Sequence, residues 1–180
     1  KDSDAYLQAS LYAYKLEPSA DAAIGCAAMA FKKGDIDGSV KFFDEAISYE
    51  TDNVKKAESA YKAASVLASA KKISQARSYA QKAISFNENY GAPYILIAQL
   101  YAGNYKWNDE PALNKCTFFA AIDKLQRAKA VDPSVAEEAN KLISSYSAYT
   151  PEAKDLFMLG YKAGDRITIG GWIGETTTIR

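Results

Sequence analysis

One short pattern recurs four times along the chain, and an internal repeat constrains the fold more than any other feature of this sequence. In each copy, an alanine in an amphipathic stretch is followed five positions later by proline, threonine or glutamate. The alanines stand 33, 37 and 45 residues apart, so a period of about 34 residues fits if two copies carry insertions of about 3 and 11 residues. Such periods are typical of stacked helix pairs. The four pairs are Ala13/Pro18, Ala46/Thr51, Ala83/Glu88 and Ala128/Pro133.

A second amphipathic stretch accompanies the copies, with apolar residues at i, i+3, i+4 and i+7. This spacing places four side chains on one face of a helix, and small residues in the middle let a neighbouring helix approach closely. We expect these helices to end at breakers such as Gly34, and another to begin at Asp132-Pro133. The four faces are Ile24, Ala27, Ala28 and Phe31; Ala60, Ala63, Ala64 and Leu67; Tyr94, Ile97, Ala98 and Tyr101; and Ala139, Leu142, Ile143 and Tyr146.

Together these stretches resemble the tetratricopeptide repeat, in which a large residue, Leu-Gly and Tyr are followed by Ala-x3-Phe and a closing proline. The pattern covers residues 5 to about 148. The tryptophan of the repeat is missing from the first helix of every copy, and Lys129 stands where an aliphatic residue is usual. The resemblance implies an all-α fold: a right-handed α-solenoid of about three to four helix pairs over residues 1–148. It also implies a non-catalytic scaffold that binds a protein or peptide.

The composition removes several classes of function. Twenty-two acidic and 22 basic residues give zero net charge, so no broad surface for nucleic acid is expected. The absence of histidine excludes Ser-His and Cys-His nucleophile pairs and histidine-containing zinc sites. Cys26 and Cys116 are read as buried small apolar residues, and no apolar run is long enough for a transmembrane segment. We therefore expect no enzymatic activity, no catalytic residues, no metal and no cofactor.

Residues 149–180 change character and are predicted to form a capping helix followed by a β-hairpin. The tail after Gly164-Asp165 is β-branched and alternating, and Ile173-Gly174-Glu175 offers a turn. A lone hairpin is only marginally stable in water, so Ile167, Ile169 and Trp172 are expected to dock on the last helices. Two roles remain open: a cap over the end of the solenoid, or an open edge for another chain.

The same tail resembles the C-terminus of tetratricopeptide-repeat proteins from the cell envelope of Gram-negative gut bacteria. The matching residues are Asp155-Leu156-Phe157, Gly164-Asp165, Trp172-Ile173 and Glu175 to Thr178. This resemblance implies export to the periplasm or cell envelope after removal of a signal peptide, with a cytoplasmic protein as the alternative. Residues 5–16 read as the second helix of a pair whose first helix is missing. We therefore expect further repeats upstream, with a natural single-helix cap as the alternative.

Candidate binding residues fall in two places. In solenoids of this kind the first helix of each pair lines a groove, which suits an extended peptide or a partner helix. Ordinary solvated positions are the alternative explanation for the residues predicted to line it. These are Met29, Lys32, Lys33, Tyr61, Ser65, Ile95, Gln99, Asn140 and Ser144.

The second place is the insertion at residues 103–117, which carries Tyr105 and Trp107. Long loops often have a role, and both residue types are common in binding hot spots. Their rings could equally stack on sugars beside the neighbouring Asn and Asp side chains, so a glycan is the alternative ligand. Trp107 could also fold back onto the neighbouring helix as local core.

Overall fold

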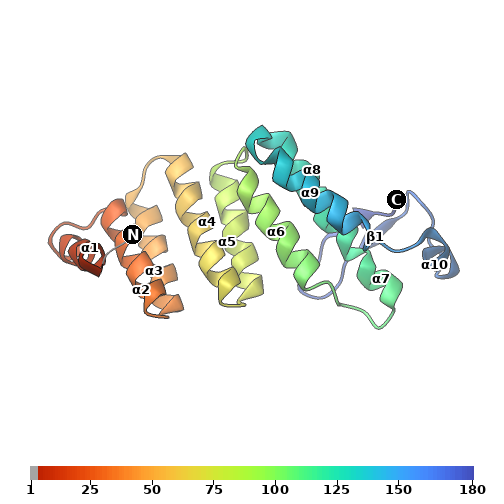
Figure 1. Cartoon of the computed structure of the whole chain (residues 1–180), viewed down its shortest axis with the longest axis horizontal. Coiled ribbons are helices and arrows are strands. Elements are labelled where there is room, and N and C mark those ends of the chain that lie inside the picture. The colour runs from red at the N-terminus through yellow and green to blue at the C-terminus, as the bar shows by residue number, and fades with distance from the viewer. Residues whose placement is uncertain (1–3) are drawn as a thin grey trace. The chain divides into compact units, whose positions relative to one another are not determined.

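The computed structural model describes residues 4–180, and their contacts divide them into two compact units, one ending at Glu88 and one spanning Asn89–Arg180 (Figure 1). Helical repeats occupy both units. The division into 1–148 and 149–180 stays a prediction, because the C-terminal segment belongs to the second unit together with the later helices. Within residues 4–180, no helix is both long and apolar enough to cross a membrane.

The first unit is a row of antiparallel helices, each packed against the next (Figure 1). The face predicted on the fourth helix is confirmed, since Ala60, Ala63 and Ala64 are fully buried and Leu67 nearly so. Small side chains there let the neighbouring helices approach closely. The helices are α1 (Asp4–Leu16), α2 (Ala20–Lys32), α3 (Ile36–Tyr49), α4 (Asn53–Ser69) and α5 (Ile73–Phe86).

The face predicted on α2 is wrong by one residue. Ala28 is exposed and Phe31 is 43% exposed, although both were expected to be buried. The helix instead buries Ala23, Cys26, Ala27 and Ala30, which satisfy the same i, i+3, i+4, i+7 spacing from a start one position earlier. Because α2 is apolar around most of its circumference, the spacing alone fits two faces, and packing between α1 and α3 selects one of them.

The first helices of two pairs, α2 and α4, end in the same way: a residue with a left-handed backbone conformation follows each of them. Gly34 has φ of 79° after α2, as its role as a breaker predicts, and Lys71 has φ of 60° after α4. An equivalent backbone bond closes the turn at each end: Asp35 N–H donates to Ala30 O at 2.9 Å, and Lys72 N–H donates to Leu67 O at 2.9 Å. Each of these bonds spans six residues, as in a Schellman motif.

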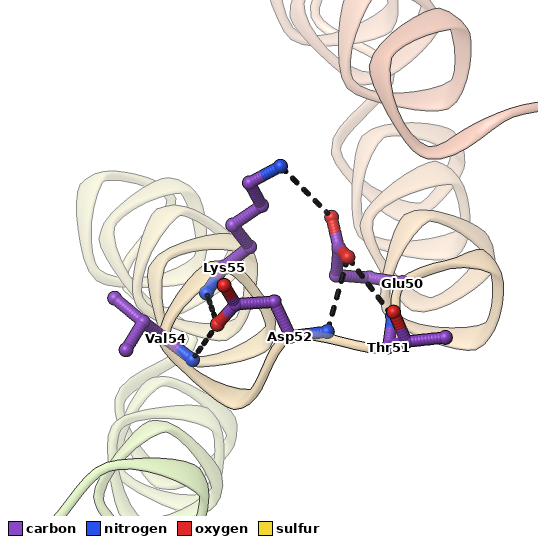
Figure 2. A network of polar contacts seen from close by, with 5 residues as sticks. All are labelled: Glu50, Thr51, Asp52, Val54 and Lys55. Carbon is purple, nitrogen blue, oxygen red and sulfur yellow. Dashed lines mark hydrogen bonds and ion pairs between the residues drawn. The ribbon is translucent and has the colours of Figure 1, made fainter.

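The corner between α3 and α4 has threonine in place of the repeat's closing proline, and side-chain acceptors hold it (Figure 2). Glu50 Oε1 accepts hydrogen bonds from the N–H groups of Thr51 at 2.9 Å and Asp52 at 3.1 Å. Asp52 Oδ1 caps α4 by accepting from Val54 N–H at 2.7 Å. The backbone donors of Asp52 and Thr51 lower the pKa of Glu50, which keeps this acceptor ionised at neutral pH.

The second unit places α8 at its centre, with α6, α7, α9 and the second strand packed against it. The predicted face of α6 is confirmed: Tyr94, Ile97, Ala98 and Tyr101 are all buried. On α9 only Ala139 of the predicted face is buried, and the other three residues are half-buried. The elements are α6 (Gly91–Gly103), α7 (Pro111–Lys115), α8 (Thr117–Val131), the 3-10 turn η1 (Pro133–Val135), α9 (Ala136–Ser147), α10 (Ala153–Met158), β1 (Arg166–Thr168) and β2 (Thr176–Thr178).

The helix start predicted at Asp132-Pro133 is confirmed, although its first turn is the 3-10 turn η1. Asp132 Oδ1 accepts from Ser134 N–H at 3.1 Å, and Oδ2 accepts from Gly91 N–H at 3.1 Å. The Ser134 hydroxyl and these backbone donors lower the pKa of Asp132. A Cβ at position 91 would lie 2.6 Å from Val135 Cγ2, so glycine is needed where the start of α6 meets this turn.

The β-hairpin forms, with Ile167 opposite Thr177 in an antiparallel pair. Its connection is wider than the turn predicted at Ile173-Gly174-Glu175: seven residues, 169–175, separate the strands, and Gly171 and Gly174 take positive φ. Docking through Ile167 and Ile169 is confirmed, since both are buried, and the second strand packs on α8. Trp172 is half-buried, with its ring edge-on to Tyr101 at 5.5 Å.

Candidate functional site

The second unit contains an open hollow of about 490 Å³, and half of the residues that line it are aromatic. It lies where α6 ends, where α7 and α8 meet, and where α9 ends, so four separate segments supply its walls. We call it the aromatic hollow. Its lining residues are Gln99, Ala102, Gly103, Tyr105, Lys115, Phe118, Tyr146 and Tyr149.

Phe118, at the start of α8, is the centre of the aromatic hollow. Its ring is buried and touches three tyrosine rings, with centroid distances of 5.4 Å to Tyr105, 5.9 Å to Tyr146 and 5.5 Å to Tyr149. Aromatic pairs at such distances stabilise one another beyond the area that they bury. Phe118 therefore fixes the positions of three tyrosines that come from different segments.

The insertion is a folded loop, and the buried side chain of Asn114 organises it. Asn114 Oδ1 accepts from the N–H groups of Trp107 at 2.7 Å and Asn108 at 2.8 Å, while Nδ2 donates to Asn108 O at 2.7 Å. The Thr117 hydroxyl donates to Tyr105 O at 3.1 Å. These bonds hold Tyr105 against the start of α8, where it forms one wall of the aromatic hollow.

Trp107 lies outside the aromatic hollow, so the structure separates the two aromatic residues predicted in the insertion. Its ring packs on the hairpin connection, where a Cβ added to Gly170 would lie 2.7 Å from Trp107 Cε3. The indole Nε1 is buried without a hydrogen-bond partner in the part of the chain that the structure describes. Trp107 thus contacts the hairpin, whereas the sequence suggested the neighbouring helix as its packing partner. It also lines a polar hollow of about 420 Å³ with Lys106, Asn108 and Asp109.

A third hollow of about 410 Å³ adjoins the aromatic hollow and shares Gly103 and Tyr105 with it. Asn104, Lys106 and Trp172 form the rest of its lining, so we call it the hairpin hollow. The two hollows together run from the end of α9 past Tyr105 to the connection of the hairpin. An extended ligand could occupy both of them, because they meet along shared residues.

The groove residues predicted in the first unit have mixed surroundings. Lys32 and Lys33 are exposed, and Met29 is half-buried. Tyr61 is half-buried and packs on the cluster formed by Ile47, Ala60 and Ala83. The Ser65 hydroxyl donates to Tyr61 O at 3.0 Å, so it bonds within its own helix.

The groove residues predicted in the second unit separate into buried and open positions. Ile95 is only 4% exposed, which makes it a core residue and not an open groove position. The reason is that α6 is apolar on nearly every side, so its buried arc is wider than one helical face. Gln99 is exposed and lines the aromatic hollow. Asn140 accepts a hydrogen bond from Lys129 at 2.9 Å, and Ser144 is exposed.

Sequence reasoning misses most of the aromatic hollow. The repeat pattern assigns no role to Phe118 or Tyr149, and it places Tyr146 on a packing face. One signal is available, because Tyr146 and Tyr149 are three residues apart at the end of a predicted helix, a spacing that puts both rings on one side. The meeting of these tyrosines with Phe118 depends on how α8 and α9 pack, which a sequence pattern does not specify.

The charged residues that line the two hollows are both lysines. Lys115 and Lys106 are exposed, and no carboxylate lines the aromatic hollow or the hairpin hollow. The charge of Lys115 acts on Glu152, whose pKa is lowered first by its hydrogen bond with Lys154 and also by the Lys115 charge. Lys154 Nζ lies 2.9 Å from that carboxylate, so two cations share one anion.

The tyrosines of the aromatic hollow are available as hydrogen-bond donors. Among residues 4–180, the hydroxyls of Tyr105, Tyr146 and Tyr149 have no hydrogen-bond partner. Burial raises the pKa of Tyr146, so this hydroxyl stays protonated at neutral pH. In the same range, no three Cys, Asp or Glu side chains gather in a way that could hold a metal ion. The arrangement is suited to holding a ligand by ring contacts and hydrogen bonds.

No family model matches the sequence, and no curated protein matches it either. Among solved structures, the chain is similar to the crystal structure of MamA, with 15% sequence identity over 84% of this chain and 85% of that chain, at a TM-score of 0.54. MamA is a tetratricopeptide-repeat protein. At this identity the similarity concerns the fold, and it confirms the predicted α-solenoid of tetratricopeptide-like helix pairs; the paired strands β1 and β2 confirm the short hairpin.

Proposed function

Because the chain has a tetratricopeptide-like helical-repeat fold, we propose that it is a non-catalytic scaffold that binds a protein or peptide partner at the aromatic hollow. One observation carries the proposal: three tyrosines surround a buried phenylalanine at an open surface, with hydroxyls that have no partner within residues 4–180. Tyrosines held in place by a rigid core are common hot spots of protein interfaces, because they add contact area at a low cost in conformational entropy.

The exposure of Tyr149 supports this assignment. Its side chain is 58% exposed although its ring stacks on Phe118, so one face of the ring stays open to a partner. Covering such a face removes apolar area from water and is favourable. A ring that is already fixed loses little freedom when a ligand covers it.

We further propose that the partner belongs to a cell-envelope assembly, and that the protein is exported to the periplasm or cell envelope. The support is the resemblance of the C-terminal tail to envelope tetratricopeptide-repeat proteins, which rests on Asp155-Leu156-Phe157, Gly164-Asp165 and the Glu175 to Thr178 run.

A carbohydrate ligand is the second candidate, since Trp107 lies beside Asn108 and Asp109 in an open polar hollow of about 420 Å³. Amide and carboxylate groups next to an aromatic ring suit a sugar. A glycan array distinguishes the two candidates. Binding that Trp107→Ala abolishes would favour carbohydrate, and an array without hits would favour a protein partner.

A peptide-display selection on the whole chain tests the first proposal. Peptides enriched on the parent should lose binding to Tyr149→Ala and to Tyr146→Ala. Tyr12→Ala is the matched control, because Tyr12 is a 67% exposed tyrosine on α1, in the other unit. If no enriched peptide distinguishes the Tyr149 and Tyr146 variants from this control, the aromatic hollow is not the binding site.

A further inference from the structure

We propose that the aromatic hollow and the hairpin hollow together bind an acidic, extended peptide, with an apolar side chain beside Phe118 and carboxylates near Lys115 and Lys106. The inference rests on the proposed function and adds the chemical class of the partner. It concerns a surface that the insertion and the C-terminal segments build, and not the predicted groove along the first helices of the pairs.

The two hollows have one lysine each and no carboxylate among their lining residues. Lys106 has no ion pair among the residues that the structure describes, and Lys115 acts on Glu152, which already bonds to Lys154 at 2.9 Å. Cations in excess at a concave surface attract an anionic ligand and repel a basic one. This excess is local, because the whole chain has a net charge of zero.

The shape of the two hollows suits an extended peptide with an apolar side chain. The aromatic hollow has an apolar floor at Phe118 and tyrosine rings as walls, and its volume of about 490 Å³ can hold an apolar side chain. The hairpin hollow continues from it across Gly103 and Tyr105 to Trp172. Gly103 has no side chain, so a ligand backbone can pass close to the end of α6 at this point.

The hydrogen-bonding groups that line the two hollows also suit a peptide. The lining offers donors: the three tyrosine hydroxyls, the Gln99 and Asn104 amides, and the two lysine ammonium groups. The Asn104 amide nitrogen donates to Leu100 O at 3.0 Å, while its amide oxygen remains an acceptor. An extended peptide presents a row of carbonyl oxygens that can accept from such donors. Acidic side chains add further acceptors with charge, and charge-assisted bonds are stronger than neutral ones.

Three labelled octapeptides test the proposal by fluorescence anisotropy with the whole chain. The probe is Gly-Glu-Glu-Phe-Glu-Leu-Glu-Gly, and its matched versions carry Gln or Lys at every Glu. Exposed ion pairs contribute about 0.2–1 kcal/mol each, so two pairs should make the acidic probe bind about 2- to 30-fold more tightly than the Gln version. The Lys version should bind least, and rising salt should weaken the acidic probe most.

A charge reversal at the two lysines provides the decisive comparison. In the double variant Lys106→Glu/Lys115→Glu the order of affinities should invert, so that the Lys peptide binds best. Both lysines are exposed, so the variant is expected to fold, which circular dichroism checks. A second variant, Lys41→Glu/Lys62→Glu, reverses two exposed lysines of the first unit and should keep the parent's order.

The outcomes separate the inference from the function on which it rests. If the three probes bind equally and Tyr149→Ala weakens all of them, a peptide site exists but the acidic preference is wrong. Preference for the acidic probe that survives the reversal at Lys106 and Lys115 would also overturn the inference. If none of the probes binds while display selection yields hollow-dependent peptides without acidic residues, the inference fails and the proposed function stands. Failure of both experiments rejects both proposals.

Discussion

The hydroxyl of Thr177 on β2 donates a 2.6 Å hydrogen bond to Asp123 Oδ2 on α8, and this bond joins the C-terminal hairpin to the helical repeats. Thr177 is 3% exposed, so its hydroxyl has no ready replacement partner in water. Arg180 also pairs with Asp123, and its guanidinium lies over the Phe119 ring at 5.7 Å. A second link joins Glu175 to Tyr101, whose hydroxyl donates at 2.6 Å, and to Lys124 at 2.8 Å.

Replacing Asp123 by alanine should destabilise the second unit by about 1–3 kcal/mol, because a buried hydroxyl then lacks its acceptor. Urea denaturation followed by circular dichroism measures this change in the free energy of unfolding. Asp109→Ala removes a carboxylate from the exposed insertion and should change stability by less than about 0.5 kcal/mol. Equal effects of the two substitutions would mean that the Thr177–Asp123 bond does not hold the hairpin.

Contact between Gly170 and Trp107 predicts a steric effect. Gly170→Ala places a Cβ 2.7 Å from Trp107 Cε3, so the ring or the hairpin connection must move. Overpacking of this kind costs about 1–3 kcal/mol. Gly103→Ala is the matched control, since a Cβ there meets nothing within 4 Å. Tryptophan emission should shift in the first variant and stay unchanged in the second; the reverse result would contradict the placement of Trp107.

The alternation of small and large residues predicted most of the fold, because it records which side of each helix a neighbour covers. It worked best on α4, where only one face is apolar. It failed on α2, where Ala23, Cys26 and Ala30 fit the same spacing as the predicted Ala28 and Phe31. The hairpin was expected from its β-branched residues, but its connection was not, since Gly171 and Gly174 allow several turns of different length.

The candidate site was less predictable than the fold. Tyr105 and Gln99 were named from the sequence, whereas Phe118 and Tyr149 were not, and only packing of α8 brings these residues together. Packing also buries Ile95, although the predicted groove along the first helices of the pairs placed it at the surface. A rule based on position within a repeat assumes regular repeats, and the insertion at residues 103–117 breaks that regularity where the site forms.

The equivalent helix ends at Gly34 and Lys71 should respond differently to substitution. Gly34→Ala puts a Cβ at a φ of 79° and should destabilise the first unit by about 1 kcal/mol. Lys71→Gly relieves the same strain at a φ of 60° but frees the unfolded chain, so its stability should stay within about 0.5 kcal/mol of the parent. Thermal unfolding of both variants measures the difference, and similar losses in both would contradict this account of the helix ends.

The buried thiol of Cys116 predicts a loss of stability in alkali. Burial raises its pKa from 9.0 to about 11, because a thiolate is poorly solvated between α7 and α8. The unfolded chain therefore releases this proton first. The contribution of the buried, protonated thiol to the free energy of unfolding is complete below pH 9. It is lost as the pH rises through about 11. Cys116→Ala should flatten the plot of unfolding free energy against pH between pH 9 and about 11. An unchanged slope would assign the loss to other groups, one of which is Tyr79, because burial and Asp44 also raise its pKa.

Two residues of the aromatic hollow, Phe118 and Tyr149, should differ in their effects on stability and on peptide binding. Phe118 is buried among three tyrosines, so Phe118→Ala should cost about 3–5 kcal/mol and abolish peptide binding through loss of the fold around it.

Tyr149 lies at the open side of the same ring, 58% exposed, and its removal leaves the core intact. Tyr149→Ala should therefore change the free energy of unfolding by less than about 1 kcal/mol while weakening peptide binding about 10-fold or more. Denaturation and anisotropy on the same preparations measure both quantities. If Tyr149→Ala lowers stability as much as Phe118→Ala does, Tyr149 belongs to the core; if it lowers neither quantity, no ligand uses the open face of its ring.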